Sequence, residues 1–232
     1  MINVGVSAGF HDAASTTLNG KEIIFANHCE RYSQIKGDPN FDDYVLPMHY
    51  DNIAFYEKPF LKNTRRLFAG QRMKWPNKKY DYYFGHHETH AAAGYYTSPF
   101  NECNVLVVDA IGEWNTISIW EGKDDKLKKL KTWNYPYSLG LLYSAITRRI
   151  GLKPNEDEYI TMGMAAFGEP KYDLEYLLHK NNHRGVGKIF PRAHPNDLAA
   201  SVQNLYETKF LELLKYCEYS NIVIMGGCAL NC

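Results

Sequence analysis

The chain has 232 residues, enough for one large or two modest domains, and its 26 basic residues balance its 26 acidic residues. A zero net charge argues against a nucleic-acid groove or a membrane surface as the main partner, so we expect neither nucleic acid nor membrane among its partners. The sequence contains no apolar stretch of membrane-spanning length, no signal-peptide pattern in its first ten residues and no CxxC spacing among its five cysteines, so we expect a cytoplasmic protein with reduced thiols.

The first 26 residues predict an antiparallel meander of three strands. Residues 2–6 and 14–18 are strand-like, Asn19-Gly20 is a strong hairpin signal, and residues 22–26 form the returning strand. The first turn, residues 7–12, is polar and contains a glycine, which lets backbone amides approach an anion. His11 lies in this turn, where it is either a simple turn histidine or an acid–base catalyst.

Between residues 30 and 84 the pattern changes to strands alternating with a helix. A polar segment contains Lys36, which could meet an anionic substrate or only be solvated. Residues 53–56 are expected to form a strand, 60–68 a basic helix and 80–84 another strand. This alternation favours an α/β layer.

A histidine cluster, His86, His87 and His90, opens the next predicted helix. If this helix begins at His86, then His86 and His90 stand four residues apart on one face. The valine-rich run 103–108 predicts a buried strand with Asp109 at its carboxyl end. Two imidazoles and one carboxylate are a recurrent ligand set for a divalent metal, with iron(II) favoured over zinc.

Two alternatives to this metal site stay open. Histidine pairs on helices are often ordinary surface residues, and an aspartate at a strand end often only caps a turn. His87 is three residues from His90 and could replace His86 as the ligand.

Beyond Asp109 the order of elements starts again. Residues 109–114 predict a second glycine turn around Gly112, followed by strands at 116–120 and 127–133. An internal duplication of a meander-plus-helix unit would place the two glycine turns facing each other across a cleft, with a nucleotide between them.

The rest of the chain predicts mainly helices. Ser138 caps a helix that runs to residue 150, and further helices are expected at residues 172–180 and 198–216. The glycines at positions 163 and 168 are either close-approach points for a ligand or simple helix ends.

A buried strand is expected close to the end of the sequence. Residues 222–225 run into Gly226-Gly227, a pattern that usually precedes a helix, and the sequence stops at Cys232 without one.

With these turns placed, the sequence resembles the NodU/CmcH family of O-carbamoyltransferases, which belong to the actin, sugar-kinase and Hsp70-like ATPase superfamily. The stretches that carry the resemblance occur in family order along the whole chain. They are FHDAAS (residues 10–15), ERYSQIK (30–36), HHETHAAAGYYTSPF (86–100), VLVVDAIGEWNT (105–116), SLGLLYSAIT (138–147), EYITMGMAAFGEP (158–170) and GGCALNC (226–232). The resemblance implies an α/β, actin-like (ribonuclease H-like) ATPase fold of two duplicated lobes, residues 1–101 and 102–232, the second incomplete at its carboxyl end.

The resemblance also implies a reaction and a set of site residues. Family members form a carbamoyl adenylate from ATP and carbamoyl phosphate, and then pass the carbamoyl group to a substrate hydroxyl. By this resemblance, His86, His90 and Asp109 hold an iron-type divalent metal, and His11 assists removal of the hydroxyl proton in a region that Lys36 also lines. The matching nucleotide-cleft positions are Gly112, Gly163, Gly226, Gly227 and Asn231.

The family pattern extends further than this sequence, which stops inside the adenosine-binding motif. A fourth metal ligand and the YrdC-like domain that makes carbamoyl adenylate are not in it. We therefore expect the amino-terminal part of an ATP-dependent O-carbamoyltransferase, which acts on a small-molecule hydroxyl acceptor together with a complementary carboxyl-terminal chain. The alternatives are a truncated product, a non-catalytic metal- and nucleotide-binding fragment, and a relative of the tRNA threonylcarbamoyl-transfer enzymes.

Overall fold

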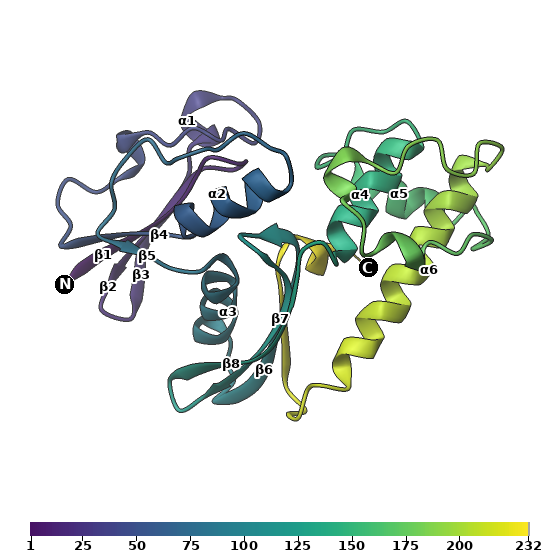
Figure 1. Cartoon of the computed structure of the whole chain (residues 1–232). Helices are drawn as coiled ribbons and strands as arrows, with labels where there is room; N and C mark the ends of the chain where they lie inside the picture. The colour runs from purple at the N-terminus through teal and green to yellow at the C-terminus, as the bar shows by residue number, and fades with distance from the viewer. Residues whose placement is uncertain (232) are drawn as a thin grey trace. The chain divides into compact units, whose positions relative to one another are not determined.

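The computed structural model describes residues 1–231 (Figure 1). The chain divides into two compact units, Met1–Thr89 and His90–Cys232. The division falls inside helix α3 (His86–Thr97), whereas the sequence predicts the lobe boundary at residues 101 and 102. The assignment of the two units to the two lobes stays a prediction. Within the described residues, no helix combines the length and the apolar character that crossing a bilayer requires.

The first unit is built on a five-stranded sheet with the order β3-β2-β1-β4-β5. The strands are β1 (Ile2–Ser7), β2 (Ala14–Asn19), β3 (Glu22–His28), β4 (Asn52–Phe55) and β5 (Tyr82–Tyr83). The first three strands pair antiparallel, which confirms the predicted meander, and β4 pairs in parallel with β1 and β5. The helical segments of this unit are α1 (Glu30–Ser33), the 3-10 turn η1 (Asp43–Val45) and α2 (Pro59–Phe68).

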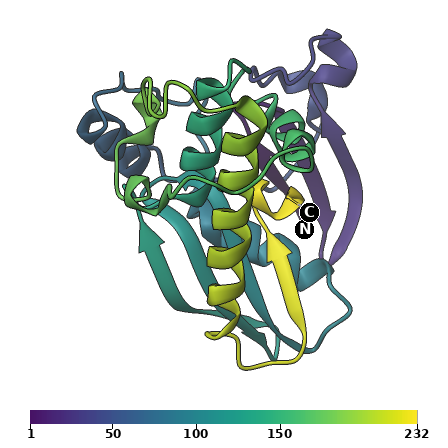
Figure 2. The same ribbon diagram turned by 90° about the vertical axis from the view of Figure 1, so that its right-hand side faces the viewer.

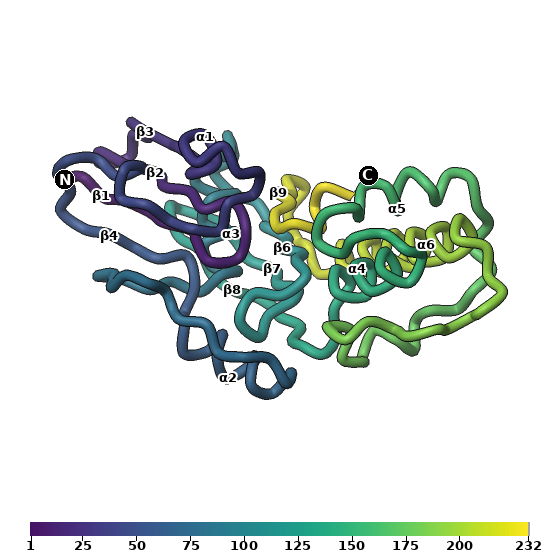
Figure 3. The backbone as a smooth tube through the Cα atoms, turned by 90° about the horizontal axis from the view of Figure 1, so that it is seen from above, coloured from purple at the N-terminus to yellow at the C-terminus, as the bar shows by residue number. Residues whose placement is uncertain are grey.

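The second unit contains a four-stranded sheet with the order β8-β7-β6-β9. The strands are β6 (Glu102–Gly112), β7 (Asn115–Lys123), β8 (Lys126–Asn134) and β9 (Ile222–Met225). Its helices are the part of α3 from His90 onwards, α4 (Leu139–Arg149), α5 (Glu158–Ala165) and α6 (Pro195–Leu214), with 3-10 turns η2 (Glu175–Leu177), η3 (Asn182–Arg184) and η4 (Gly227–Leu230). β9 runs parallel to β6, although more than 100 residues separate them, and Figure 3 shows the two strands side by side.

The two sheets repeat one topology. In each, a three-stranded antiparallel meander is joined through its first strand to a parallel fourth strand, as β3-β2-β1-β4 and as β8-β7-β6-β9. This repetition confirms the internal duplication expected from the sequence. The arrangement of the two glycine turns across a cleft stays a prediction.

The second sheet is covered on both faces, and β6 shows why. Its side chains alternate between two cores, with Val105 and Val107 packed on the α3 side and Leu106 and Val108 packed with α4 and α6. Both faces of a strand buried in this way need apolar residues, which explains the unbroken apolar run at residues 105–108. Figure 2 shows α6 lying along the second of these faces.

Helix α4 begins where the sequence predicts. Ser138 has an extended backbone, and its hydroxyl accepts a hydrogen bond from the Leu141 amide at 3.0 Å, as an N-cap does. Eight residues of α4 are buried, so tertiary packing as well as the cap stabilises this helix.

The expected end of the strand at residue 108 is wrong. β6 continues to Gly112, so Asp109 lies inside the strand, where the pairing with β7 is irregular between Val108 and Gly112. The turn is formed by Glu113 and Trp114, and Glu113 supplies the left-handed conformation with a φ of 50° while Gly112 pairs with Asn115. Glu113 and Trp114 thus form the two-residue turn of a tight hairpin, and Gly112 is a strand residue.

The expected helix at residues 172–180 is also wrong, because only the three-residue turn η2 forms there. Asp173 accepts a hydrogen bond from the Glu175 amide at 2.9 Å, which favours a turn over a continuous helix. This single turn already buries the apolar side chains that suggested a helical period, namely Leu174, Leu177 and Leu178.

Candidate metal centre and nucleotide-binding loops

Helix α3 carries the two histidines, and local contacts fix its first turn at His86. The Gly85 amide donates to the Glu88 carboxylate at 3.1 Å, and the Thr89 hydroxyl donates to the His86 carbonyl at 2.7 Å. A carboxylate in the first turn also interacts favourably with the helix dipole. The helix therefore begins where the predicted metal ligands require it to begin.

The packing of α3 determines where its histidine face points. His86, His90 and Gly94 are spaced by four residues and share one stripe of the helix. A Cβ at Gly94 would lie 2.6 Å from the Met225 Cγ and 2.9 Å from the Val223 Cγ1 of β9. Only a glycine allows this approach, so the stripe is pressed against the sheet, and His90 lies one turn earlier on it.

Asp109 meets this stripe from β6. Because side chains alternate along a strand, Asp109 shares the α3 side with Val105 and Val107. Its Oδ2 lies 3.7 Å from the His90 Nε2, and its Oδ1 accepts from the Ala110 amide at 2.8 Å. The carboxylate is thus held by its own backbone and directed at the helix.

The three predicted ligands come together in space. One donor atom from each of His86, His90 and Asp109 lies within 4.8 Å of the others. Atoms bound to one ion at about 2.1 Å lie roughly 3–4 Å apart, so small side-chain rotations would bring this set onto an ion. Two imidazole nitrogens and one carboxylate oxygen also suit iron(II) in chemical type. The donor set fits a divalent metal, and ligation stays a prediction.

His87 occupies a different environment from its neighbours. It is only 1% exposed, its ring centroid lies 6.0 Å from that of His86, and it is not part of the three-residue cluster. Of the two ligand sets that the sequence allows, the geometry therefore favours the one with His86.

The glycine pair after β9 borders the cluster. Gly226 has a φ of +94°, and a Cβ there would lie 2.3 Å from the Val108 carbonyl oxygen, so the position requires glycine. A Cβ on Gly227 would lie 3.3 Å from the Asp109 Oδ1. The predicted nucleotide loop and the predicted metal ligand are therefore direct neighbours.

The start of α4 packs against the same segments, next to Asp109 and the glycine pair. The Ser138 hydroxyl donates to the Ala110 carbonyl at 2.6 Å, which ties the cap to the residue after Asp109. A Cβ on Gly140 would lie 2.6 Å from the Ala110 Cα and 2.6 Å from the Cys228 Sγ. A helix amino terminus, a glycine pair and a candidate metal ligand thus converge, an arrangement suited to an anion such as phosphate.

Asn231 is fixed by α6. It exchanges two hydrogen bonds with the Gln203 amide, at 2.7 Å and 3.1 Å, and Gln203 also accepts from the Tyr143 hydroxyl at 2.8 Å. One turn along α6, the Tyr206 hydroxyl donates to the Cys228 carbonyl at 2.6 Å. Sequence reasoning missed Gln203 and Tyr206, because nothing near them in the sequence marks them as supports for a loop more than 20 residues away.

The remaining predicted nucleotide positions, Gly112 and Gly163, lie on other elements. Gly112 is buried in β6, and Gly163 is exposed on α5, where an added Cβ would meet nothing within 4 Å. Gly168 differs, since a Cβ there would lie 2.1 Å from the Asn196 carbonyl oxygen. Packing therefore explains the glycine at position 168 and leaves the one at position 163 open to a ligand role.

In the first unit, His11 and Lys36 lie on segments that are joined by backbone hydrogen bonds. The Gly9 amide donates to the Pro39 carbonyl at 2.8 Å, and the Ala13 amide donates to the Asp38 carbonyl at 2.7 Å. Lys36 lines a shallow hollow together with Glu30, Arg31 and Gln34.

His11 has a partner that the sequence analysis did not identify. Its Nδ1 lies 2.6 Å from the Asp12 Oδ2, and Asp12 has a left-handed φ of 49°. Asp12 also donates its amide to the Gly37 carbonyl at 3.2 Å. The adjacent histidine and aspartate in FHDAAS were the available signal, but only the backbone conformation shows that the carboxylate turns towards the ring.

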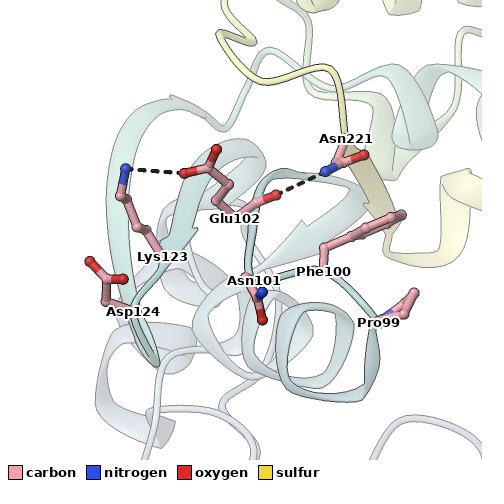
Figure 4. Close-up of a pocket in the computed structure, with 7 residues that line it drawn as sticks. All are labelled: Pro99, Phe100, Asn101, Glu102, Lys123, Asp124 and Asn221. Carbon is pink, nitrogen blue, oxygen red and sulfur yellow. Dashed lines mark hydrogen bonds and ion pairs between the residues drawn. The ribbon is translucent and has the colours of Figure 1, made fainter.

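A second surface hollow lies at the opposite end of β6 from Asp109 (Figure 4). Lys123 forms an ion pair with Glu102 at 3.0 Å, and the Asn221 side chain donates to the Glu102 carbonyl at 3.2 Å. Glu102 begins the strand, seven residues before Asp109, which is roughly 23 Å along a strand. This hollow does not belong to the metal cluster.

Known proteins resemble this chain in fold and, more distantly, in sequence. The activator of 2-hydroxyisocaproyl-CoA dehydratase from Clostridium difficile, solved with bound ADPNP, superimposes with a TM-score of 0.60 at 12% identity, over 100% of this chain and 82% of that chain. The fold is the actin-like ATPase fold that the sequence predicts.

Relatives that match in sequence include one from a cyanobacterium and one from a nodulating bacterium. The protein sll1178 from Synechocystis, which is uncharacterized, is 29% identical over 312 residues, 99% of this chain and 51% of the relative. The nodulation protein NolNO from Sinorhizobium fredii is 27% identical over 177 residues, 65% of this chain and 26% of the relative. The chain thus spans about half the length of the Synechocystis relative.

Residues 52–186 match the family described as "Carbamoyltransferase N-terminus". This region includes α3, β6 and α4, the elements that build the metal cluster and the helix amino terminus beside it. The chain belongs to this carbamoyltransferase family.

Proposed function

We propose that this chain is the nucleotide- and acceptor-binding part of an ATP-dependent O-carbamoyltransferase. The observation that supports it best is the convergence of Asp109 and His90 with Gly227 and the start of α4, in a member of the carbamoyltransferase family. This convergence offers ligands for a cation and backbone amides for a phosphate at one place.

His86, His90 and Asp109 would hold the cation. A divalent ion bound there would offset the negative charge of the nucleotide phosphate. Gly227 would leave room for a phosphate oxygen beside Asp109, and backbone amides at the start of α4 would donate hydrogen bonds to it. Asn231, held by Gln203, would supply a fixed amide to the nucleotide.

His11 would act on the acceptor. With its Nδ1 hydrogen-bonded to Asp12, its Nε2 is left to accept the proton of the attacking hydroxyl. The hydroxyl oxygen would bond to the carbamoyl carbon, the bond from that carbon to the adenylate phosphate oxygen would break, and AMP would leave. Asp12 would hold the imidazole in one tautomer and orientation, and Lys36 would contact an anionic part of the acceptor.

The carbamoyl adenylate itself would come from carbamoyl phosphate and ATP in a complementary chain. We assign this step to the part of the longer Synechocystis relative that this chain does not match. The acceptor would be a small molecule with a free hydroxyl.

A reconstituted transfer assay tests the proposal. The chain is mixed with the carboxyl-terminal half of the Synechocystis relative, ATP, iron(II), [14C]carbamoyl phosphate and a panel of sugar and nucleoside alcohols. Label in an alcohol is expected with the wild-type chain and not with His11→Ala. Equal labelling without this chain, or no labelling of any alcohol while the mixture releases pyrophosphate, would contradict the proposal.

A further inference from the structure

Helix α2 has its polar face turned into the protein. Lys62, Asn63 and Arg65 are 8%, 2% and 4% exposed. Lys62 forms an ion pair with the buried carboxylate of Glu57, and the Arg65 guanidinium donates to the Gln71 side chain at 2.9 Å. The two buried cations, Lys62 and Arg65, thus have partners, which stabilises this orientation of the helix.

The opposite face of α2 is apolar and exposed. Phe60, Leu61, Leu67 and Phe68 fall at positions i, i+1, i+7 and i+8, which form one stripe, and are 69%, 41%, 57% and 69% exposed. We refer to these four residues as the α2 stripe. Large apolar side chains gathered on one exposed face mark an interaction surface more often than scattered ones do.

The loop after α2 adds further exposed apolar side chains beside the α2 stripe. The Lys74 amide donates to the Asn63 side chain at 2.7 Å, which holds the loop against the helix. Its residues Met73 and Trp75 are 53% and 56% exposed. Tryptophan is a residue that favours the boundary between water and an apolar phase.

The same segment is strongly basic. Residues 58–80 contain no aspartate or glutamate and eight cations, Lys58, Lys62, Arg65, Arg66, Arg72, Lys74, Lys78 and Lys79. Four of these, Lys58, Arg72, Lys74 and Lys79, are exposed. The zero net charge of the chain therefore hides a local excess of positive charge beside the α2 stripe.

We propose that the α2 stripe and its flanking cations dock the chain onto an anionic lipid surface. Apolar side chains on one helix face, with lysine and arginine around them, allow shallow insertion between headgroups. Each exposed cation near an anionic surface strengthens binding about fivefold at low salt. This inference departs from the expectation, based on net charge alone, that the protein has no membrane partner.

Other occupants fit the stripe less well. A second copy of the chain would bring two basic segments together, and like charges repel. Single-stranded nucleic acid stacks its bases on planar rings, whereas Leu61, Leu67 and Met73 are aliphatic. An acyl chain accepts aliphatic and aromatic side chains alike, and lipid phosphates supply the negative charge.

Vesicle co-sedimentation tests the proposal. The purified chain is spun with vesicles of phosphatidylglycerol and phosphatidylcholine in equal parts, and with vesicles of phosphatidylcholine alone. Binding is expected to the anionic vesicles only, and to weaken at least tenfold in 0.5 M salt. The double variants Phe60→Ser/Leu67→Ser and Arg72→Gln/Lys74→Gln are each expected to lose about tenfold or more in binding.

Matched controls separate docking from general surface changes. Leu211→Ser removes a leucine of α6 that is 64% exposed, and Lys126→Gln/Lys128→Gln removes two exposed lysines of β8. Both should bind as wild type, and all variants should keep the wild-type thermal melt. Absence of binding to anionic vesicles at low salt, or equal losses in the controls, would overturn the proposal. Equally tight binding of a single-stranded oligonucleotide, lost in Phe60→Ser/Leu67→Ser, would assign the stripe to nucleic acid and also overturn it.

Discussion

The His90 Nε2 lies 3.7 Å from the Asp109 Oδ2, which links a helix residue to a strand residue across the turn at Pro99. Two independent side-chain periodicities, one of the helix and one of the strand, produce this contact. The four-residue spacing on α3 places His90 one turn before Gly94, and the two-residue alternation on β6 places Asp109 on the same side as Val107. The cluster is therefore a consequence of how α3 packs on the sheet.

Removal of one ligand should weaken metal binding. His90→Ala deletes one of three clustered donors, so we expect its affinity for iron(II) or manganese(II) to fall about 100-fold, as measured by titration calorimetry and metal content. His87→Ala is the control, because His87 is buried outside the cluster and should lower the melting temperature without lowering the metal content of the folded protein. Equal losses of metal in both variants would mean that His87 is a ligand.

The glycine contact between α3 and β9 should be sensitive to a single methyl group. Gly94→Ala places a Cβ within 2.6 Å of Met225, and overpacking of this kind typically costs about 1–3 kcal/mol in the free energy of unfolding. Urea denaturation measures the loss. A fully wild-type stability in Gly94→Ala would show that α3 does not approach β9 so closely.

Gly163→Ala should behave differently in the same experiment. Position 163 has open space around it and lies in a helix, so alanine should raise the free energy of unfolding by up to about 1 kcal/mol. If Gly163 contacts a nucleotide, as the family resemblance implies, the variant should also bind ATP more weakly. Unchanged ATP binding in this variant would remove Gly163 from the nucleotide site.

The amide pair between Gln203 and Asn231 should contribute to stability. Gln203→Ala leaves the Asn231 amide without its α6 partner, and the loss of these partly buried hydrogen bonds should lower the free energy of unfolding by about 1–2 kcal/mol. Asn204→Ala, at the exposed neighbouring position, is the control and should stay within about 0.5 kcal/mol of wild type. A Gln203→Ala variant as stable as this control would contradict the pairing.

Much of the fold follows from local patterns. The meander at Asn19-Gly20, the Ser138 cap and the start of α3 depend on neighbouring residues, and the sequence alone predicts them. Residues 172–180 do not form the expected helix, because the packing of Leu174, Leu177 and Leu178 needs only one turn. Local periodicity alone cannot distinguish a segment that forms a continuous helix from one whose apolar side chains are buried by a single turn.

The sequence indicates which side chains cluster as candidate ligands, but it does not indicate the residues that support them. The spacing of His86 and His90 is visible in the sequence, whereas the fit of Gly94 against Met225 and of Gln203 against Asn231 joins residues distant in the chain. Helix α2 shows a related limit. The helical spacing of its residues separates a polar face from an apolar one. Only the buried ion pair of Lys62 with Glu57 shows that the polar face is turned inward.

Titration of ATP into the chain with and without a divalent ion tests the metal-centre proposal most directly. The wild-type chain should bind ATP at least tenfold more tightly with manganese(II) or iron(II) than after chelation, because the bound cation offsets phosphate charge. Asp109→Asn, which removes a ligand charge while keeping its shape, should abolish this difference. ATP binding that is indifferent to both the ion and Asp109→Asn would contradict the proposal that His86, His90 and Asp109 join the Gly226-Gly227 loop in a single phosphate site.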